Sequence, residues 1–189
     1  MNPLHKIFVT FVSRHKHDNK ISFTRHVEAL LRYRNVHMNR LSLKKFSAKT
    51  PMEEFFKSDK LNSSSFIVSH TSDALRFLML WKYGGTYLDS DVIVQKRLDS
   101  IPANYVCDET NNAVNGAVIN IARGFKGRWL AKLFMDELIQ SFDGSVWGSN
   151  GPLLITKVLN RLCKTNETQK MIEMGDCEGF HVLPSQLCY

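Results

Sequence analysis

The most informative segment of the chain is residues 81–94, which read WKYGGTYLDSDVIV. It joins the end of an apolar helix, a glycine pair and an extended run that Asp89 and Asp91 interrupt. The run is expected to be a strand that buries its apolar members, Leu88, Val92 and Val94. Carboxylates are costly inside a sheet unless positive charge meets them, and side chains at alternate strand positions point the same way. A hard divalent cation would compensate both; the alternative is a solvated turn, because Asp-x-Asp often occurs by chance.

The preceding residues, 69–80, predict a helix buried within a domain, because its later turns are apolar nearly all round. Thr71 or Ser72 is a suitable N-cap, and Asp73 suits a first turn, where the helix dipole favours negative charge. Asp73 and Arg76 have the spacing of residues that share one helix face. Gly84 of the glycine pair fits the position after the helix end, where positive φ is usual.

The rest of the chain alternates strand and helix patterns. β-branched and aromatic residues predict strands at 6–12, 35–43, 65–68 and 105–108. Apolar periodicity predicts helices at 24–34, 129–142 and 153–162, and a further helix start at 50–54. This order predicts an α/β fold, a mainly parallel sheet flanked by helices. A length of 189 residues fits one domain, residues 1–189.

Composition narrows the function classes. The net charge of +7 suits an acidic substrate or an anionic membrane surface. The basic residues do not interleave with aromatics in a repeated motif, so no nucleic-acid partner is expected. No apolar run reaches the length of about eighteen residues that a transmembrane helix needs. His15 and His17 lie in a basic loop without a metal-ligand partner at suitable spacing, and a solvated loop is favoured over phosphate contact.

The cysteines and sequons bear on the compartment. Cys163 and Cys177 bracket a polar loop that holds a possible glycosylation site at Asn166, and a second possible site lies at Asn62. A loop-closing cysteine pair with two sequons favours an oxidising secretory compartment. The alternative is that the sequons are chance matches and all four thiols are reduced and buried.

Several motifs in a fixed order resemble the DXD sugar-binding region of the α1,4-galactosyltransferase (globotriaosylceramide synthase-like) family. They are SDALR at 72–76, GGxYxDxD at 84–91, NGAV at 115–118, WGSNGP at 147–152 and Leu183-Pro184. The resemblance covers roughly residues 60–189 and implies a GT-A type fold that binds nucleotide sugar. It further implies metal-dependent, retaining transfer of a hexose (galactose or N-acetylhexosamine) from a UDP-sugar to a glycolipid or glycan acceptor, forming an α1,4-type linkage. The implied cofactor is Mn²⁺ or Mg²⁺.

The same resemblance assigns roles to individual residues. The expected metal ligands are Asp89 and Asp91, which with Asn150 form the expected catalytic set. The expected donor-binding residues are Asp73, Arg76, Tyr87, Asn115 and Gly116; for Asn115, an amide that merely fastens a bulge is an equal alternative. The expected acceptor loop consists of Trp147, Gly148, Ser149 and Gly151. This loop has no acid to act as nucleophile, so it suits same-face transfer in which the departing phosphate helps to deprotonate the acceptor.

Two departures from the family pattern bear on completeness. Family members are longer, and their C-terminal segment carries a histidine expected to complete the metal site, a position that His181 does not match. The usual N-terminal membrane anchor also has no counterpart. We therefore expect a partial chain of a Golgi-lumenal type II membrane protein, associated with the membrane only through a segment outside this chain.

Two other functions are considered. A non-catalytic fragment that binds nucleotide sugar or glycan would show no donor hydrolysis. A phosphohydrolase metal site is disfavoured, because the chain lacks a nucleophile-bearing motif at a strand end and a nearby general base.

Overall fold

A computed structural model describes residues 5–12, 25–95, 97–109 and 112–188 of the chain. The chain divides into two compact units, Met1–Glu53 and Glu54–Tyr189. The expectation of a single domain stays a prediction.

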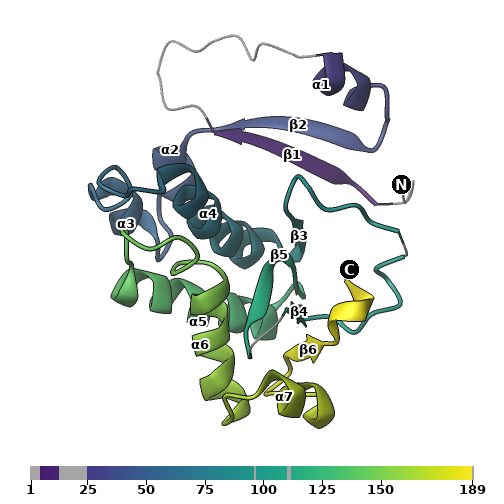
Figure 1. Ribbon diagram of the computed structural model, residues 1–189. Helices are drawn as coiled ribbons and strands as arrows, with labels where there is room; N and C mark the ends of the chain where they lie inside the picture. Colours follow the sequence, from purple (N-terminus) through teal and green to yellow (C-terminus); the bar gives the residue numbers. More distant parts are fainter. Residues whose placement is uncertain (1–4, 13–24, 96, 110–111, 189) are drawn as a thin grey trace. The chain divides into compact units, whose positions relative to one another are not determined.

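The first unit contains a two-stranded parallel sheet (Figure 1). Strand β1 (Ile7–Val12) pairs with β2 (Val36–Leu41) in register from Ile7 opposite Val36 to Val12 opposite Leu41. Both expected strands are confirmed. Helix α1 (Arg25–Leu30) is shorter than expected, because the backbone after Leu30 tightens into turns, with the Tyr33 N–H donating to the Leu30 carbonyl at 3.2 Å. Helix α2 (Leu43–Ser47) follows β2. The basic loop with His15 and His17 lies outside the described residues.

The second unit contains a four-stranded sheet of order β3-β5-β4-β6. Its strands are β3 (Gly85–Leu88), β4 (Tyr105–Asp108), β5 (Val114–Ile121) and β6 (His181–Leu183). Strand β5 runs antiparallel to both neighbours, and only β4 and β6 pair in parallel. The α/β class is confirmed, whereas the expectation of a mainly parallel sheet is wrong here. The short connection between β4 and β5 permits only an antiparallel pair.

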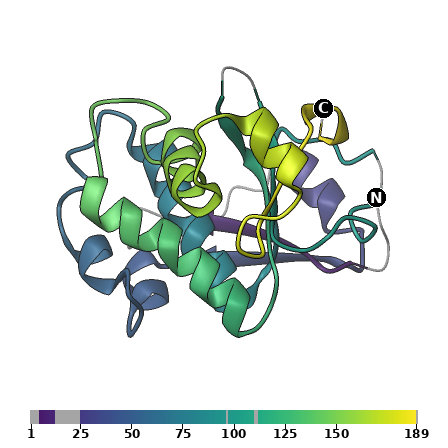
Figure 2. The ribbon, with the colours of Figure 1, turned by 90° about the horizontal axis from the view of Figure 1, so that it is seen from below.

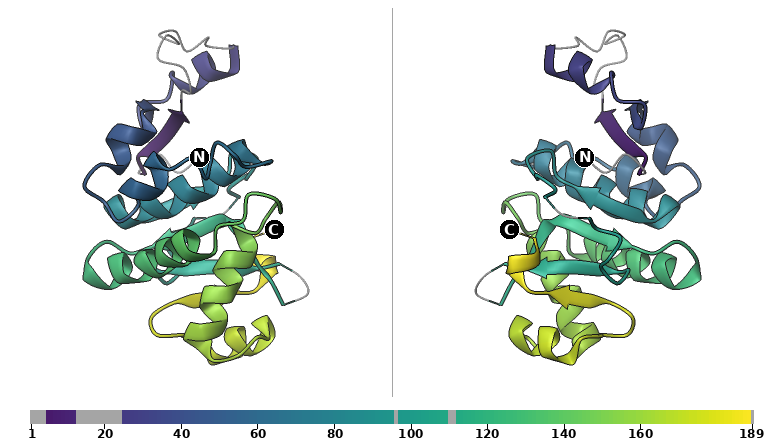
Figure 3. Two further views of the ribbon diagram at one scale, coloured as in Figure 1. Left: turned by 90° about the vertical axis from the view of Figure 1, so that its left-hand side faces the viewer. Right: turned by 90° about the vertical axis from the view of Figure 1, so that its right-hand side faces the viewer.

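Helices cover this sheet. Helix α4 (Ile67–Tyr83) packs against α5 (Phe125–Ser141), and both α5 and α6 (Pro152–Cys163) pack against β5 (Figure 2). Helix α7 (Thr168–Met174) lies beside β6, and the short helix η1 (Ser185–Leu187) follows (Figure 3). Helix α3 (Glu53–Lys57) begins at the last residue of the first unit. The expected helices at 129–142 and 153–162 are confirmed, although α5 starts earlier, at Phe125.

The core of the second unit is aromatic at its centre. Phe77 of α4 stacks on Phe134 of α5 with ring centroids 5.4 Å apart, and Phe134 meets Phe180 edge-on at 5.8 Å. All three side chains are fully buried. This packing fixes α4, which carries the polar residues of interest, against the rest of the unit.

The start of α4 differs from expectation. Residues 65–68 are not a strand, because Phe66 is the N-cap and Ile67 opens the helix. A short apolar run does not distinguish a strand from a helix end, and here the Ser64 hydroxyl accepts the Phe66 N–H at 3.0 Å. Thr71 and Ser72 are consequently interior helix residues rather than N-caps. The helix ends as expected at Gly84, with a φ of 63° and its N–H donating to the Leu80 carbonyl at 2.8 Å.

The described cysteines are all disulfide-bonded. Cys163 pairs with Cys177, as the loop-closing spacing suggested, and Cys107 pairs with Cys188. The alternative of four reduced thiols is therefore wrong. Among the described residues, the helices all fall short of the length and apolar character that crossing a bilayer requires.

Candidate functional site

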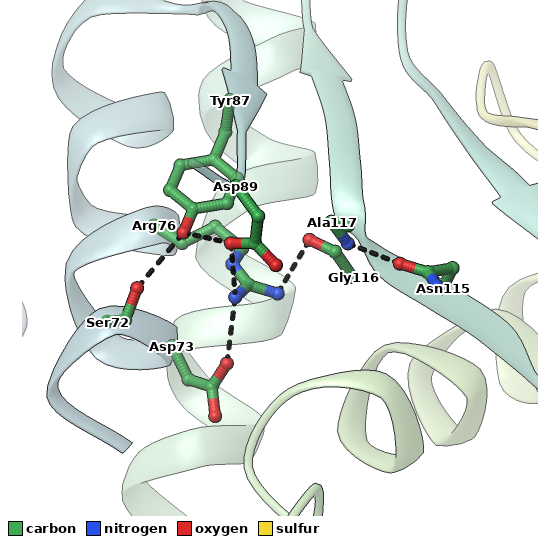
Figure 4. A network of polar contacts seen from close by, with 8 residues as sticks. All are labelled: Ser72, Asp73, Arg76, Tyr87, Asp89, Asn115, Gly116 and Ala117. Atoms are coloured by element: carbon green, nitrogen blue, oxygen red, sulfur yellow. Dashed lines mark hydrogen bonds and ion pairs between the residues drawn. The ribbon is translucent and has the colours of Figure 1, made fainter. Parts of the chain in front are cut away.

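A buried arginine, Arg76 of α4, is the centre of a polar network (Figure 4). Its side chain is 5% exposed. Nη2 lies 3.0 Å from Oδ1 of Asp73 and 3.5 Å from Oδ1 of Asp89, while Nη1 donates to the Gly116 carbonyl at 2.6 Å. Three segments thus meet at one guanidinium: the α4 helix, the turn after β3, and strand β5.

Tyr87 of β3 closes this network from the other side. Its ring centroid lies 4.5 Å from Cζ of Arg76, and its hydroxyl donates to Oδ1 of Asp89 at 2.5 Å. Because that proton is committed to Asp89, the Ser72 hydroxyl, 3.0 Å away, donates to the Tyr87 oxygen. Tyr87 and Arg76 therefore fix the orientation of the Asp89 carboxylate. The sequence did not indicate this contact of Ser72.

Burial governs the electrostatics of the site. It raises the pKa of Asp73, against the opposing effects of Arg76 and His70, and it also raises the pKa of the Tyr87 hydroxyl. Nε of Arg76 is buried without a hydrogen-bond partner among the described residues. Buried donors are normally paired, so this N–H is expected to donate a hydrogen bond to a ligand or to an ordered water.

Two glycines allow the close packing around these charges. A Cβ at Gly116 would overlap Nη1 of Arg76, and a Cβ at Gly151 would lie 2.6 Å from Oδ1 of Asp73. The expected acceptor loop therefore reaches the network directly, through Gly151.

The two aspartates of the DXD motif lie on a turn rather than on a strand. Strand β3 ends at Leu88; the Asp89 N–H then donates to the Ala117 carbonyl at 2.9 Å, and the Val92 N–H donates to the Asp89 carbonyl at 3.2 Å. The expectation of a continuing strand that buries its apolar residues is wrong. The chain leaves the β5 ladder after the Leu88–Val118 pair, and Leu88 and Val94 are 37% and 42% exposed.

This turn leaves both carboxylates accessible. The Asp89 side chain is 34% exposed, and Asp91 is exposed. Within the described part of the chain, no three His, Cys, Asp or Glu side chains gather where they could hold a metal ion. The turn therefore offers two oxygen ligands, and a bound ion would take its others from a ligand and water.

Asn115 fastens its own strand. Its Oδ1 accepts the Ala117 N–H at 2.5 Å, and its Nδ2 donates to Oε1 of Glu109 at 3.3 Å. These contacts support the structural alternative, and donor binding by Asn115 stays a prediction.

The expected acceptor loop is held by internal hydrogen bonds. Asn150 is fully buried; its Oδ1 accepts the Asp143 N–H at 3.1 Å, and its Nδ2 donates to the Asp143 carbonyl at 2.6 Å. The Ser149 hydroxyl donates to the Val146 carbonyl at 2.7 Å, whereas Trp147 is 66% exposed. Asn150 thus shapes the loop, and its catalytic role stays a prediction.

His70, which the sequence analysis did not single out, connects α4 to this loop. Its Nδ1 lies 2.7 Å from the Ser64 hydroxyl, and its Nε2 lies 3.2 Å from the Val146 carbonyl. A lone histidine in an apolar helix gives no sequence signal of such a contact.

A shallow surface depression lies at the base of the loop, away from the Arg76 network, and is lined by Lys60, Ser63, Ser65, Phe142, Asp143, Gly144 and Ser145.

Comparison with known proteins identifies the class. Residues 4–108 match the family described as "Glycosyltransferase sugar-binding region containing DXD motif", and residues 125–189 match the "Alpha 1,4-glycosyltransferase conserved region". The chain therefore belongs to the DXD-containing α1,4-glycosyltransferase family. This confirms the resemblance seen in the sequence, and the mixed α/β structure is consistent with the GT-A type.

Several curated proteins are similar in sequence to this chain. The chain is 30% identical to a lactosylceramide 4-alpha-galactosyltransferase of Pongo pygmaeus over 155 residues, 82% of this chain and 68% of the relative. It is 29% identical to the Homo sapiens protein of that name over 170 residues, 89% of this chain and 46% of the relative. It is 25% identical to the Homo sapiens alpha-1,4-N-acetylglucosaminyltransferase over 156 residues, 82% of this chain and 44% of the relative. The chain thus spans about half the length of most of these relatives. No solved structure matches the chain significantly.

Proposed function

We propose that the chain forms the nucleotide-sugar site of a metal-dependent, retaining glycosyltransferase. Its reaction would move a hexose, galactose or N-acetylhexosamine, from a UDP-sugar to a glycolipid or glycan acceptor and form an α1,4-type linkage. The observation that carries the proposal is the Arg76 network, which joins Asp73 and Asp89 of the DXD region around one buried guanidinium. The relatives' names supply the two sugars and the linkage.

The residues present fit a hard divalent cation. Asp89 and Asp91 offer accessible carboxylate oxygens on one turn, the ligand type that Mn²⁺ and Mg²⁺ prefer. Such ions commonly keep several waters and bind substrate phosphates, so a diphosphate and water would supply further ligands beside these two carboxylates. When bound, the ion would neutralise charge that develops on the departing diphosphate.

The chain's own residues would position the donor. Asp73, packed against Gly151, accepts hydrogen bonds from donor-sugar hydroxyls, and Arg76 holds Asp73 in place. Tyr87 holds Asp89 so that its carboxylate faces the same region as the guanidinium.

The acceptor would enter beside the loop that carries Trp147 and Gly151. The acid in this segment, Asp143, accepts hydrogen bonds from the Ser145 hydroxyl and N–H, which lower its pKa. The Asp143 carboxylate is thus already hydrogen-bonded to Ser145 at the base of the loop. This arrangement supports same-face transfer in which the departing phosphate, rather than a protein carboxylate, takes the acceptor proton.

The proposed location is the Golgi lumen. Two disulfides, Cys107–Cys188 and Cys163–Cys177, suit an oxidising compartment of the secretory pathway.

The test is a titration of the chain with UDP-galactose, UDP-N-acetylglucosamine and UDP-glucose, each with and without Mn²⁺, followed by an assay of donor hydrolysis. We expect one UDP-sugar to bind more tightly than the others, only with Mn²⁺, and to be slowly hydrolysed. Binding without any hydrolysis or transfer would favour the alternative of a non-catalytic nucleotide-sugar-binding protein. Failure of all three donors to bind would contradict the proposal.

A further inference from the structure

His70 links α4, the helix that carries Asp73, to the segment that carries the acceptor loop. Its side chain is fully buried, and its two ring nitrogens face different parts of the chain. We propose that His70 is a positioning residue, which donates a hydrogen bond to the Val146 carbonyl and thereby holds the acceptor loop against the donor-binding face of α4. This inference rests on the proposed function and adds to it the residue that keeps the loop beside the donor sugar.

The hydrogen bonds around the imidazole assign its hydrogens. The Val146 carbonyl can only accept, so Nε2, which lies 3.2 Å away, carries a hydrogen. Nδ1 lies 2.7 Å from the Ser64 hydroxyl, and we assign it as the acceptor of that hydroxyl proton. The Gly144 carbonyl, 3.2 Å from the same hydroxyl, already accepts the Ser65 N–H at 2.9 Å. A neutral ring with its hydrogen on Nε2 therefore satisfies all these groups.

Two aromatic side chains fix the orientation of the imidazole. The rings of Phe66 and Phe142 meet it edge-on, with centroids 5.7 Å and 5.6 Å from its own. Phe66 is the N-cap of α4, and Phe142 is the C-cap of α5. The ring is thus held from both sides, so that Nε2 stays directed at Val146.

The acceptor segment touches one face of α4 at two points. His70 and Asp73 share that face, because they lie three residues apart in the helix. The Val146 carbonyl is bound at His70, and Gly151 packs on Asp73 so closely that a Cβ would lie 2.6 Å from Oδ1. Release of the first contact would let Gly151 move away from the carboxylate that is proposed to bind the donor sugar.

The loop keeps its own hydrogen bonds when this link is lost. The Ser149 hydroxyl also donates to the Val146 carbonyl, at 2.7 Å. The Asn150 amide bonds to both the N–H and the carbonyl of Asp143. Loss of the His70 hydrogen bond is therefore expected to change where the loop lies and to leave its internal turn intact.

The burial of His70 separates positioning from catalysis. Its side chain is 0% exposed, and both ring nitrogens are occupied by groups of the protein. The imidazole consequently has no nitrogen free to exchange a proton with a substrate. It acts on the reaction only through the loop that it holds.

The test compares two amide replacements of His70. The glutamine amide reaches the position of Nε2 and can donate to the Val146 carbonyl, whereas the asparagine amide ends near the position of Nδ1 and reaches only Ser64. The readout is the rate of chymotryptic cleavage after the exposed Trp147, which follows the population in which the segment is released. We expect His70→Asn to raise this rate about two- to tenfold, the effect of one lost hydrogen bond, and His70→Gln to keep it near the wild-type rate.

Cleavage after Tyr33, an exposed residue of the first unit, is the internal control. An equal rise at both sites in His70→Asn, an equal rise after Trp147 in both variants, or no rise in either would overturn the proposal. Circular dichroism checks that the variants are folded. If His70→Asn does not fold, the deciding variant is Ser64→Ala, which removes the partner of Nδ1, and an unchanged rate after Trp147 in that variant would overturn the proposal.

A second measurement tests the link to the donor sugar. UDP, UDP-galactose and UDP-N-acetylglucosamine are titrated into the wild type and the two His70 variants with Mn²⁺. We expect all three proteins to bind UDP equally, and His70→Asn alone to bind the UDP-sugar severalfold more weakly. Equal weakening of UDP and UDP-sugar in His70→Asn would overturn the proposal. Failure of the wild type to bind any of these ligands would contradict the proposed function, while the cleavage rates would still decide the role of His70.

Discussion

At the scale of single residues, Asp73 and Arg76 are buried charges that depend on each other. Each side chain is 5% exposed, so neither can recover its hydration if the partner is lost. A pair at this spacing on an exposed helix face would contribute only about 0.3–0.5 kcal/mol. Loss of either side chain is therefore expected to lower the stability of the fold as well as to weaken ligand binding.

We predict that Asp73→Asn lowers the free energy of unfolding by about 1–3 kcal/mol, because it removes the nearer carboxylate of the buried Arg76 and leaves only the Asp89 carboxylate at 3.5 Å. It should also weaken binding of UDP-sugar much more than binding of UDP, since Asp73 is proposed to contact the sugar. Chemical denaturation and calorimetric titration measure the two effects. The control, Glu54→Gln, breaks an exposed pair of the same spacing with Lys57 and should change stability by less than about 0.5 kcal/mol. Equal weakening of both ligands would count against a sugar contact.

At the scale of elements, sequence periodicity predicted the body of α4 but not its first turn. Ile67 and Val68 suit a strand as well as a helix, and the hydrogen bond from Phe66 to Ser64 that opens the helix has no pattern in the sequence. The end at Gly84 was predictable, because a left-handed residue after a helix is a local property.

The turn at Asp89 was not predictable for a different reason. Apolar residues on both sides suggested a continuous strand, but strand length depends on the partner. The Ala117 carbonyl accepts the Asp89 N–H, and the neighbouring Gly116 carbonyl is used by Arg76. These are contacts with a distant part of the chain, which local propensity does not contain.

Helices α5 and α6 are joined by Glu137, whose side chain is 3% exposed. Its carboxylate lies 2.6 Å from Nζ of Lys157 and 2.6 Å from Nη2 of Arg161, and accepts a hydrogen bond from Ser141. Burial alone would raise the pKa of Glu137, but these partners together lower it to about 2. A glutamate whose pKa is lower in the folded than in the unfolded state stabilises the fold at pH values above its ordinary pKa. This contribution to stability is lost as the pH falls through the folded-state pKa.

We therefore predict that Glu137→Gln lowers the free energy of unfolding at neutral pH by about 1–3 kcal/mol. The difference from wild type should shrink as the pH falls from 4.5 to about 2, where the wild-type carboxylate takes up its proton. Denaturation curves across this range measure it. Glu167→Gln, which affects an exposed pair with Lys170, should show little change at any pH. A constant difference across the range would contradict the assigned pKa.

At the scale of the whole molecule, the sequence motifs predicted most of the residues of the site but not the contacts between them. Asp73, Arg76, Tyr87, Asp89 and Gly116 come from α4, β3, the following turn and β5, and they meet around one guanidinium. Their identities were read from the order of the motifs. Their packing was not predictable, because it depends on how α4 and β5 come together. The roles assigned to Asn115 and Asn150 show the same limit, since amides that fasten a loop look alike in sequence to amides that bind a ligand.

The two sequons make the proposed compartment testable. Asn62 and Asn166 are both exposed in the structure. We predict that the chain, directed into the secretory pathway of a eukaryotic cell, carries glycans at both, because exposed Asn-x-Ser/Thr sites in secreted proteins are acceptors. Glycosidase treatment should lower its apparent mass in two steps, and Asn62→Gln and Asn166→Gln should each remove one. An unmodified chain with reduced cysteines would contradict the lumenal assignment.

The central claim is that Asp89 and Asp91 bind a divalent ion together with a nucleotide diphosphate. The most direct measurement is calorimetric titration of UDP into the wild-type chain and into Asp91→Asn, each with and without Mn²⁺. Asp91 is exposed, so its nearly isosteric replacement should leave the melting temperature unchanged. We predict that Mn²⁺ strengthens UDP binding to the wild type at least about tenfold, a difference of about 1.4 kcal/mol, and has no effect on the variant. Equal, Mn²⁺-dependent UDP affinity in both proteins would contradict the claim.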